Sequence, residues 1–190
     1  NKRLIAAYAV DTHTIEAINE AVKFNLVDAT LVGDEALINA SCKELNIDPK
    51  QFEIIHQPND MAAATLAVDL INKGKGELLM KGLVSTDKYM RAILNKENGL
   101  LPPKGVLTHV TVIENPSYHK LLIVGDVAII PQPDFSQKVA ITNFLIQTAH
   151  KLGIEMPKVA LIAAAEQITM GMTASYEAAI ISKMIDRGQI

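Results

Sequence analysis

Short runs of aliphatic residues recur along the chain, with little polar alternation inside them. They lie at Leu4–Val10, Ala29–Val32, Phe52–Ile55, Glu77–Met80, Val106–Ile113, Leu121–Val124 and Val159–Ala165. An apolar run without alternation is typical of a parallel strand that is covered on both faces. We therefore expect these runs to be buried strands of a mainly parallel sheet.

Between most of these runs, apolar residues recur at the spacing of a helix. The stripes are Ile15, Ile18, Val22 and Leu26; Leu66 and Leu70 with Ala62–Ala64; Val139, Phe144, Leu145 and Ala149; and Ala178, Ile181 and Ile185. Asn59 and Ser85 resemble N-caps, because an acid follows each of them in the first turn. Alternation of strands and helices along the whole chain predicts an α/β fold.

The alternation breaks at Leu101–Gly105, where two prolines prevent a helix from continuing. The runs Val106–Glu114 and Leu121–Val124 follow with no room for a helix between them, so we expect them to be antiparallel neighbours. The pattern alone leaves two interpretations open. A boundary near residue 102 separates two α/β lobes, or the prolines form a loop within one domain.

Composition narrows the class of protein. Of the 190 residues, 49% are hydrophobic but only 4% are aromatic, so the core is aliphatic and a disordered chain is excluded. A net charge of −3 provides no field for a nucleic-acid backbone. The longest wholly apolar run is too short for the ~20 residues of a membrane span. The single cysteine favours a reducing, cytoplasmic setting and predicts no disulfide. The scattered histidines and the absence of a second cysteine predict no zinc site.

The segment after the fourth run has the residues of an anion site. Lys81 places a cation at a strand end, Gly82 permits close backbone approach, and Ser85 and Thr86 bring hydroxyls to a helix start. Arg91 lies one to two turns along the same helix. The alternative is structural: Ser85 and Thr86 form an N-cap, and Arg91 pairs with Asp87 at i, i+4.

Two carboxylates also follow aliphatic runs. Asp126 comes after Leu121–Val124, and Glu166 comes directly after Val159–Ala165. Acids at strand ends either bind a ligand or solvate a turn. The methionine-rich loop Thr169–Thr173 is of the kind that lines an adaptable apolar channel, or it leads into a helix capped by Thr173.

Taken in order, several motifs resemble the phosphate acetyl/butyryltransferase family, and within it the butyryl-transferring branch. They are Leu79–Thr86, Arg91-Ala92, Leu107–Val110, Gly125–Ala128, Pro157–Ala160, Met172–Ala174 and Ser182–Ile190. The resemblance implies reversible transfer of a short acyl group, such as butyryl, between coenzyme A and inorganic phosphate. It also implies a cytoplasmic homo-oligomer, a dimer or larger, with coenzyme A as a substrate and no prosthetic group.

The family fold implied by this resemblance has two α/β/α lobes and a cleft between them, as in isocitrate and isopropylmalate dehydrogenases. The lobes correspond to residues 1–102 and 103–190. Family members continue with a segment that completes the first lobe and carries a Ser-Arg pair and the proposed base. We therefore expect this chain to be truncated at its C-terminus, with those catalytic residues beyond Ile190.

The resemblance also assigns roles to the candidate residues. Those for phosphate or acyl phosphate are Lys81, Gly82, Ser85, Thr86 and Arg91; those on the coenzyme A and acyl side are Asp126, Glu166, Thr169 and Met170. The sequence departs from the family pattern in two places. Ile129-Ile130 stands where a polar Asn is usual, and Thr169–Gly171 replaces a usual Asn-Pro-Lys.

Two other functions compete with the transferase. A non-catalytic domain that binds coenzyme A or acyl phosphate for regulation would share these binding residues. A dehydrogenase of the related two-lobed fold would need arginine clusters and metal-binding aspartates, which the sequence lacks.

Overall fold

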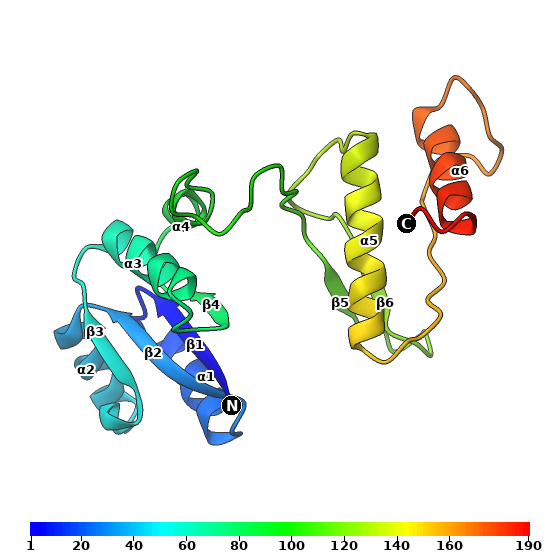
Figure 1. Cartoon of the computed structure of the whole chain (residues 1–190). Coiled ribbons are helices and arrows are strands. Elements are labelled where there is room, and N and C mark those ends of the chain that lie inside the picture. Colours follow the sequence, from blue (N-terminus) through cyan, green and yellow to red (C-terminus); the bar gives the residue numbers. More distant parts are fainter. The chain divides into compact units, whose positions relative to one another are not determined.

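Four of the aliphatic runs form one parallel sheet, as predicted (Figure 1). The computed structural model describes residues 1–190, which divide into a first unit, Asn1–Gly105, and a second unit, Val106–Ile190. The strands of the first unit are β1 (Lys2–Ala7), β2 (Val27–Gly33), β3 (Glu53–His56) and β4 (Leu78–Lys81). Their order in the sheet is β3-β2-β1-β4.

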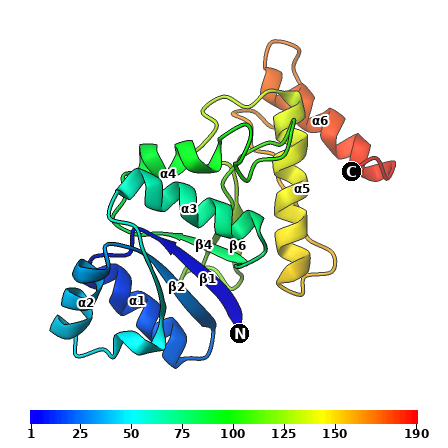
Figure 2. The same ribbon diagram turned by 60° about the vertical axis from the view of Figure 1, so that its left-hand side comes forward.

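Helices cover both faces of this sheet (Figure 2). They are α1 (Thr12–Lys23), α2 (Glu35–Glu44), α3 (Asp60–Asn72) and α4 (Thr86–Ile93), with a short 3-10 helix at Pro49–Gln51. Successive residues of β1 point to opposite faces, so Leu4 and Ala6 pack with α1 and α2, whereas Ile5 and Ala7 pack with α3 and α4. Each aliphatic run of this sheet is therefore covered by helices on both faces, which explains its lack of polar alternation.

The helices of the first unit begin at side chains that cap them. Asp11, Asp34, Asn59 and Ser85 each accept a hydrogen bond from an amide of the first turn, which confirms the predicted caps at Asn59 and Ser85. The predicted stripe of α1 was wrong at its end. The helix stops at Lys23, and Leu26 lies in the following turn with 62% of its surface exposed.

The first unit has a topological switch point between β1 and β4. The chain leaves β1 toward α1 on one face of the sheet and leaves β4 toward α4 on the other. In open α/β sheets, ligands bind outside the carboxyl ends of strands at such a point. The residues that follow Ala7 and Met80 are therefore the candidates for ligand binding.

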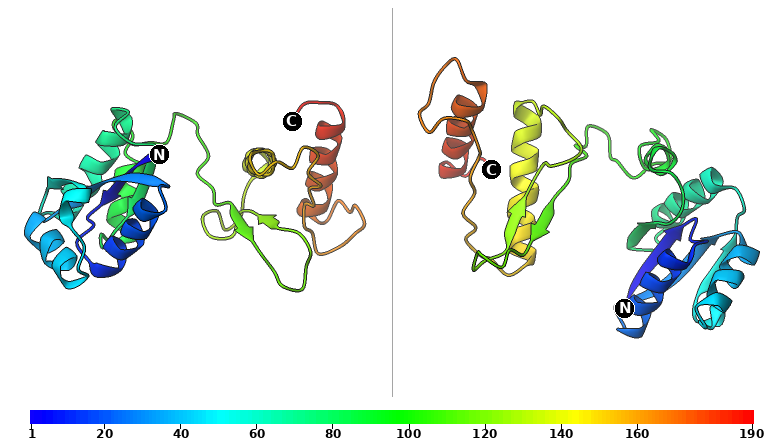
Figure 3. Two further views of the ribbon diagram at one scale, coloured as in Figure 1. Left: turned by 90° about the horizontal axis from the view of Figure 1, so that it is seen from below. Right: turned by 180° about the vertical axis from the view of Figure 1, so that it is seen from behind.

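The second unit contains two strands and two helices. They are β5 (Thr111–Ile113), β6 (Leu122–Val124), α5 (Phe135–Lys151) and α6 (Thr173–Asp186). The strands pair antiparallel, as predicted, and lie beside α5 (Figure 3). The prediction of a buried strand over Val106–Ile113 was wrong for most of its length, since only Thr111–Ile113 pairs with β6 and Val112 is 42% exposed. An ion pair between Lys138 of α5 and Glu177 of α6 is largely covered and joins the two helices.

The prediction of a strand at Val159–Ala165 was wrong. The segment pairs with no strand, although its residues alternate between more and less covered positions, and Ile162 is 87% exposed. A strand forms only where a neighbour accepts and donates its backbone hydrogen bonds. Here β5 and β6 pair only with each other, so an apolar run alone did not suffice.

None of the helices combines the length and the apolar character needed to cross a membrane.

Candidate functional site

The loops that follow β1 and β4 are held together by their backbones. Gly82 donates its amide hydrogen to the Ala7 carbonyl at 2.9 Å, and Leu83 donates to the Tyr8 carbonyl at 2.9 Å. Tyr8 has a φ of 56°, in the left-handed region. A Cβ on residue 82 would lie 2.4 Å from the Tyr8 oxygen, so only glycine fits here. The end of β1 therefore sets the path of the chain into α4.

Lys81 is the last residue of β4 and is exposed at the carboxyl edge of the sheet. Its ammonium donates to the Gly82 carbonyl at 3.3 Å. Lys81 forms no ion pair with a carboxylate. Its charge is thus available to an anion at the switch point.

The start of α4 adds backbone donors to this cation. The Ser85 hydroxyl accepts the Lys88 amide hydrogen at 3.4 Å, which confirms the structural role of Ser85 as an N-cap. Thr86 is the first residue of the helix and is exposed. The first amides of a helix have no partner within it, so those of Thr86 and Asp87 remain available to an anion.

Arg91 lies on the same helix and pairs with Asp87, the alternative that the spacing left open. The Arg91 Nε lies 3.0 Å from a carboxylate oxygen of Asp87, and the two side chains are 69% and 70% exposed. An ion pair this exposed contributes only ~0.3–0.5 kcal/mol. Arg91 can therefore leave Asp87 for a more strongly charged anion at little cost.

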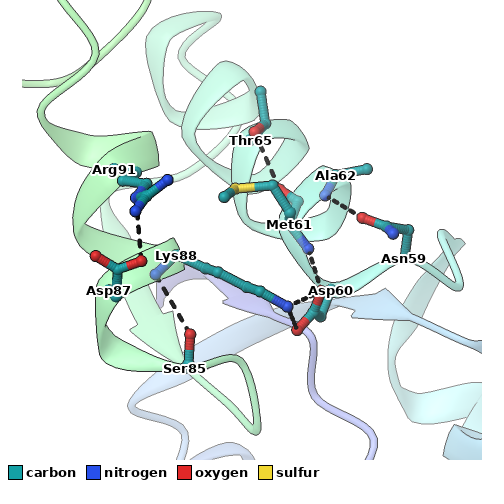
Figure 4. A network of polar contacts seen from close by, with 9 residues as sticks. All are labelled: Asn59, Asp60, Met61, Ala62, Thr65, Ser85, Asp87, Lys88 and Arg91. Atoms are coloured by element: carbon teal, nitrogen blue, oxygen red, sulfur yellow. Dashed lines mark hydrogen bonds and ion pairs between the residues drawn. The ribbon is translucent and has the colours of Figure 1, made fainter.

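An ion pair that the sequence did not predict lies between the starts of α3 and α4 (Figure 4). The Lys88 ammonium donates to both carboxylate oxygens of Asp60, at 2.9 and 2.6 Å, and the Met61 amide donates to Asp60 at 2.7 Å. The hydrogen bond from Lys88 is the main cause that lowers the pKa of Asp60. Asp60 and Lys88 are 28 positions apart, and no local pattern relates them.

In the second unit, Asp126 is occupied by its own chain. Its carboxylate accepts hydrogen bonds from the Thr108 hydroxyl and the amides of Ala128 and Ile129, each at 2.8 Å, and from the Ile130 amide at 3.2 Å. Four donors fill the acceptor sites of a carboxylate. In this structure Asp126 therefore holds the turn that follows β6, which is the structural alternative for this residue.

These hydrogen bonds give Asp126 an acid-dependent effect on stability. Partial burial raises its pKa, but hydrogen bonds from Ile129, Ala128 and Thr108 outweigh that effect and hold the pKa far below its usual range. The unfolded chain then binds a proton more readily than the folded one. The stabilisation is present above the ordinary pKa of about 4 and is lost as the pH falls through the folded pKa.

We expect Asp126→Asn to lower the free energy of unfolding at pH 7 and to flatten its decrease between about pH 5 and pH 2. Urea unfolding at a series of pH values measures both effects. Asp186→Asn is the matched control, because Asp186 is an exposed carboxylate of the same unit that contacts only Lys183, at 3.1 Å. Equal acid slopes in wild type and Asp126→Asn would contradict this role.

Glu166, Thr169 and Met170 lie in the segment before α6. Glu166 is exposed at the edge of a hollow of about 430 Å³ lined by residues of 159–168 and by α6. The Thr169 backbone is held by Ser175, whose hydroxyl accepts its amide hydrogen at 3.0 Å, while Met170 is 83% exposed. The prediction that Thr173 caps α6 was wrong: Met172 is the N-cap, and no side chain caps this helix.

The structure therefore places five candidate residues at the carboxyl edge of one sheet and on the loop and helix that follow it. They are Lys81, Gly82, Ser85, Thr86 and Arg91. The other candidates lie in two separate segments of the second unit, one around Asp126 and one at residues 166–170. The first group is the stronger candidate site. It combines a cation without an acidic partner with free helix amides.

Comparison with known proteins identifies the family. The model of the family described as "Phosphate acetyl/butaryl transferase" matches residues 56–190, a range that includes all nine candidate residues. The chain belongs to this family. Among relatives of the phosphate acetyl/butaryl transferase family, the phosphate butyryltransferase of Clostridium acetobutylicum is 42% identical over 100% of this chain and 62% of its own length. The phosphate acetyltransferase of Thermotoga maritima is 36% identical over 100% of this chain and 64% of its own.

A solved structure shows the same fold. A branched-chain phosphotransacylase from Enterococcus faecalis V583 superposes with a TM-score of 0.79 at 23% identity, covering 98% of this chain and 64% of that one. The chain thus spans less than two thirds of the length of these two relatives and of the solved chain.

Proposed function

We propose that the protein transfers a short acyl group, such as butyryl, between coenzyme A and inorganic phosphate, giving acyl phosphate and free coenzyme A. Membership of the phosphate acetyl/butaryl transferase family is the observation that carries this proposal. The unpaired Lys81 and the start of α4 support it, since an oxyanion is what they suit.

In this proposal the first-unit residues bind phosphate or the phosphoryl end of acyl phosphate. Lys81 supplies a cation, the amides of Thr86 and Asp87 supply neutral donors, and Gly82 lets the chain pass close to the end of β1. Arg91 reaches the anion by exchanging its exposed pair with Asp87. Donors already held in place stabilise a charged group without reorganising during the reaction.

In this reaction one bond to the acyl carbon forms and one breaks. A phosphate oxygen attacks the thioester carbonyl carbon, the carbon–sulfur bond breaks, and the sulfur leaves as the thiolate of coenzyme A. In the reverse direction the thiol, with a pKa of about 8.5, must lose its proton before it attacks the acyl phosphate. We leave the base unassigned. On the coenzyme A and acyl side we propose Glu166, Thr169 and Met170, and Asp126, which holds the turn after β6 in a separate segment of the second unit.

We further propose that residues 1–102 and 103–190 act as two lobes of a cytoplasmic homo-oligomer, with lobes of the kind found in isocitrate and isopropylmalate dehydrogenases. The division of the chain into units at Gly105 and Val106 supports the two lobes. Coenzyme A is a substrate in this proposal, and no prosthetic group takes part.

The test is release of free thiol from butyryl-CoA in the presence of inorganic phosphate, with acetyl-CoA in parallel and a reaction without phosphate as the control. We expect phosphate-dependent release that saturates with both substrates. Absence of turnover with either acyl-CoA would overturn the transferase. Tight binding of coenzyme A without turnover would instead support the regulatory alternative.

A further inference from the structure

Helices α3 and α4 begin next to each other, and a lysine joins their first turns (Figure 4). Asn59 caps α3 and Ser85 caps α4. Both helix starts carry partial positive charge, which disfavours their close approach unless a negative group lies between them. The Asp60 carboxylate is that negative group, in the first turn of α3.

Lys88 connects the two helices through its backbone amide and its side-chain ammonium. Its backbone amide donates to the Ser85 hydroxyl at 3.4 Å, and its ammonium donates to both oxygens of Asp60, at 2.9 and 2.6 Å. The Asp60 carboxylate is further held by the Met61 amide at 2.7 Å. A shift of the first turn of α4 would therefore stretch the contacts of Lys88 with Asp60.

The same arrangement distinguishes the cations at this edge. Lys88 is committed to Asp60, and Arg91 is paired with Asp87, whereas Lys81 has no carboxylate partner. Lys88 thus has its charge neutralised while its backbone supports the cap of α4. Lys81 is therefore the cation that remains for an anion, whereas Lys88 stabilises the start of α4.

We infer that Asp60 and Lys88 are positioning residues, whose ion pair holds the start of α4, with Ser85 and Thr86, in register with Lys81 for phosphate binding. This inference rests on the proposed function, because phosphate is the anion in question. Neither residue contacts the reacting atoms. Their effect is on where the amides and hydroxyls of α4 lie.

The experiment compares Asp60→Asn, Lys88→Gln and the conservative Lys88→Arg in the full chain. We expect the two neutralising variants to raise the KM for phosphate about threefold to fivefold, with kcat and the KM for acyl-CoA changed less than about twofold. Lys88→Arg should keep the KM for phosphate near the wild-type value. The matched control is Asp69→Asn with Lys73→Gln, an i,i+4 pair of 2.6 Å at the other end of α3, which should change nothing.

Three results would overturn the inference: an unchanged KM for phosphate in both neutralising variants, a loss of kcat with an unchanged KM for phosphate, or a lowered KM for phosphate in Asp60→Asn. The last would mean that Lys88 binds the anion itself. Binding of inorganic phosphate measured by calorimetry separates this inference from the proposed function. If wild type binds phosphate without turnover, only the proposed transferase activity fails. The Kd for phosphate of each variant, relative to wild type, then tests the Asp60–Lys88 pair in place of KM. If wild type binds no phosphate, both fail.

Discussion

Gly82→Ala is expected to lower the free energy of unfolding by about 1–3 kcal/mol and to impair any binding at the start of α4. The added Cβ would lie 2.4 Å from the Tyr8 oxygen, 2.8 Å from the Tyr8 carbonyl carbon and 2.9 Å from the Ala7 oxygen. These are backbone atoms at the end of a central strand, so they cannot rotate away as a flexible side chain would. The loop after β4 must move instead, and it takes the cap of α4 with it.

Urea unfolding followed by circular dichroism measures the loss, and Gly171→Ala is its control. A Cβ at Gly171 meets no atom within 4 Å, and Gly171 does not have a positive φ. That substitution should leave stability unchanged or raise it slightly, because alanine restricts the unfolded chain. If Gly82→Ala unfolds at the same urea concentration as wild type, the loops after β1 and β4 are not packed as described.

Lys81→Met is expected to lower kcat/KM for phosphate by about tenfold or more, which corresponds to a loss of ~1.4 kcal/mol of transition-state stabilisation. Methionine keeps most of the aliphatic length of lysine and removes the charge. Because Lys81 has no carboxylate partner, its loss leaves no acid unpaired, and stability should change little. The effect should therefore appear in kinetics with phosphate or acyl phosphate rather than in the Tm.

Lys75→Met is the matched control for this charge. Lys75 is exposed in the turn before β4, at the opposite end of the strand from Lys81. Both variants therefore lose one positive charge, but only Lys81→Met loses it at the carboxyl edge of the sheet. Equal kinetic losses in the two variants would indicate a general effect of net charge. Wild-type kinetics in Lys81→Met would mean that the residues around Ser85 only cap a helix.

The sequence predicted those features that short segments decide. The aliphatic runs of the first unit became parallel strands, and Asn59 and Ser85 became N-caps, because burial on two faces and a capping side chain both leave local patterns. It also located Lys81 beside a helix start. It did not find the contact of Lys88 with Asp60, because that contact depends on how two helices pack.

What the sequence determined by itself, then, is the alternation of strand and helix, the family resemblance and the candidate residues of one loop and helix start. The tertiary structure alone decided the order β3-β2-β1-β4, which makes β1 and β4 neighbours and allows no side chain at Gly82. It also decided that Arg91 pairs with Asp87, that four donors surround Asp126, and that Val159–Ala165 forms no strand. Each of these outcomes depends on a specific partner for a hydrogen bond or a steric contact. For the strand order, for Gly82 and for Val159–Ala165 the possible partners lie far away along the chain, whereas Arg91 and Asp126 have near partners that the sequence left open among alternatives.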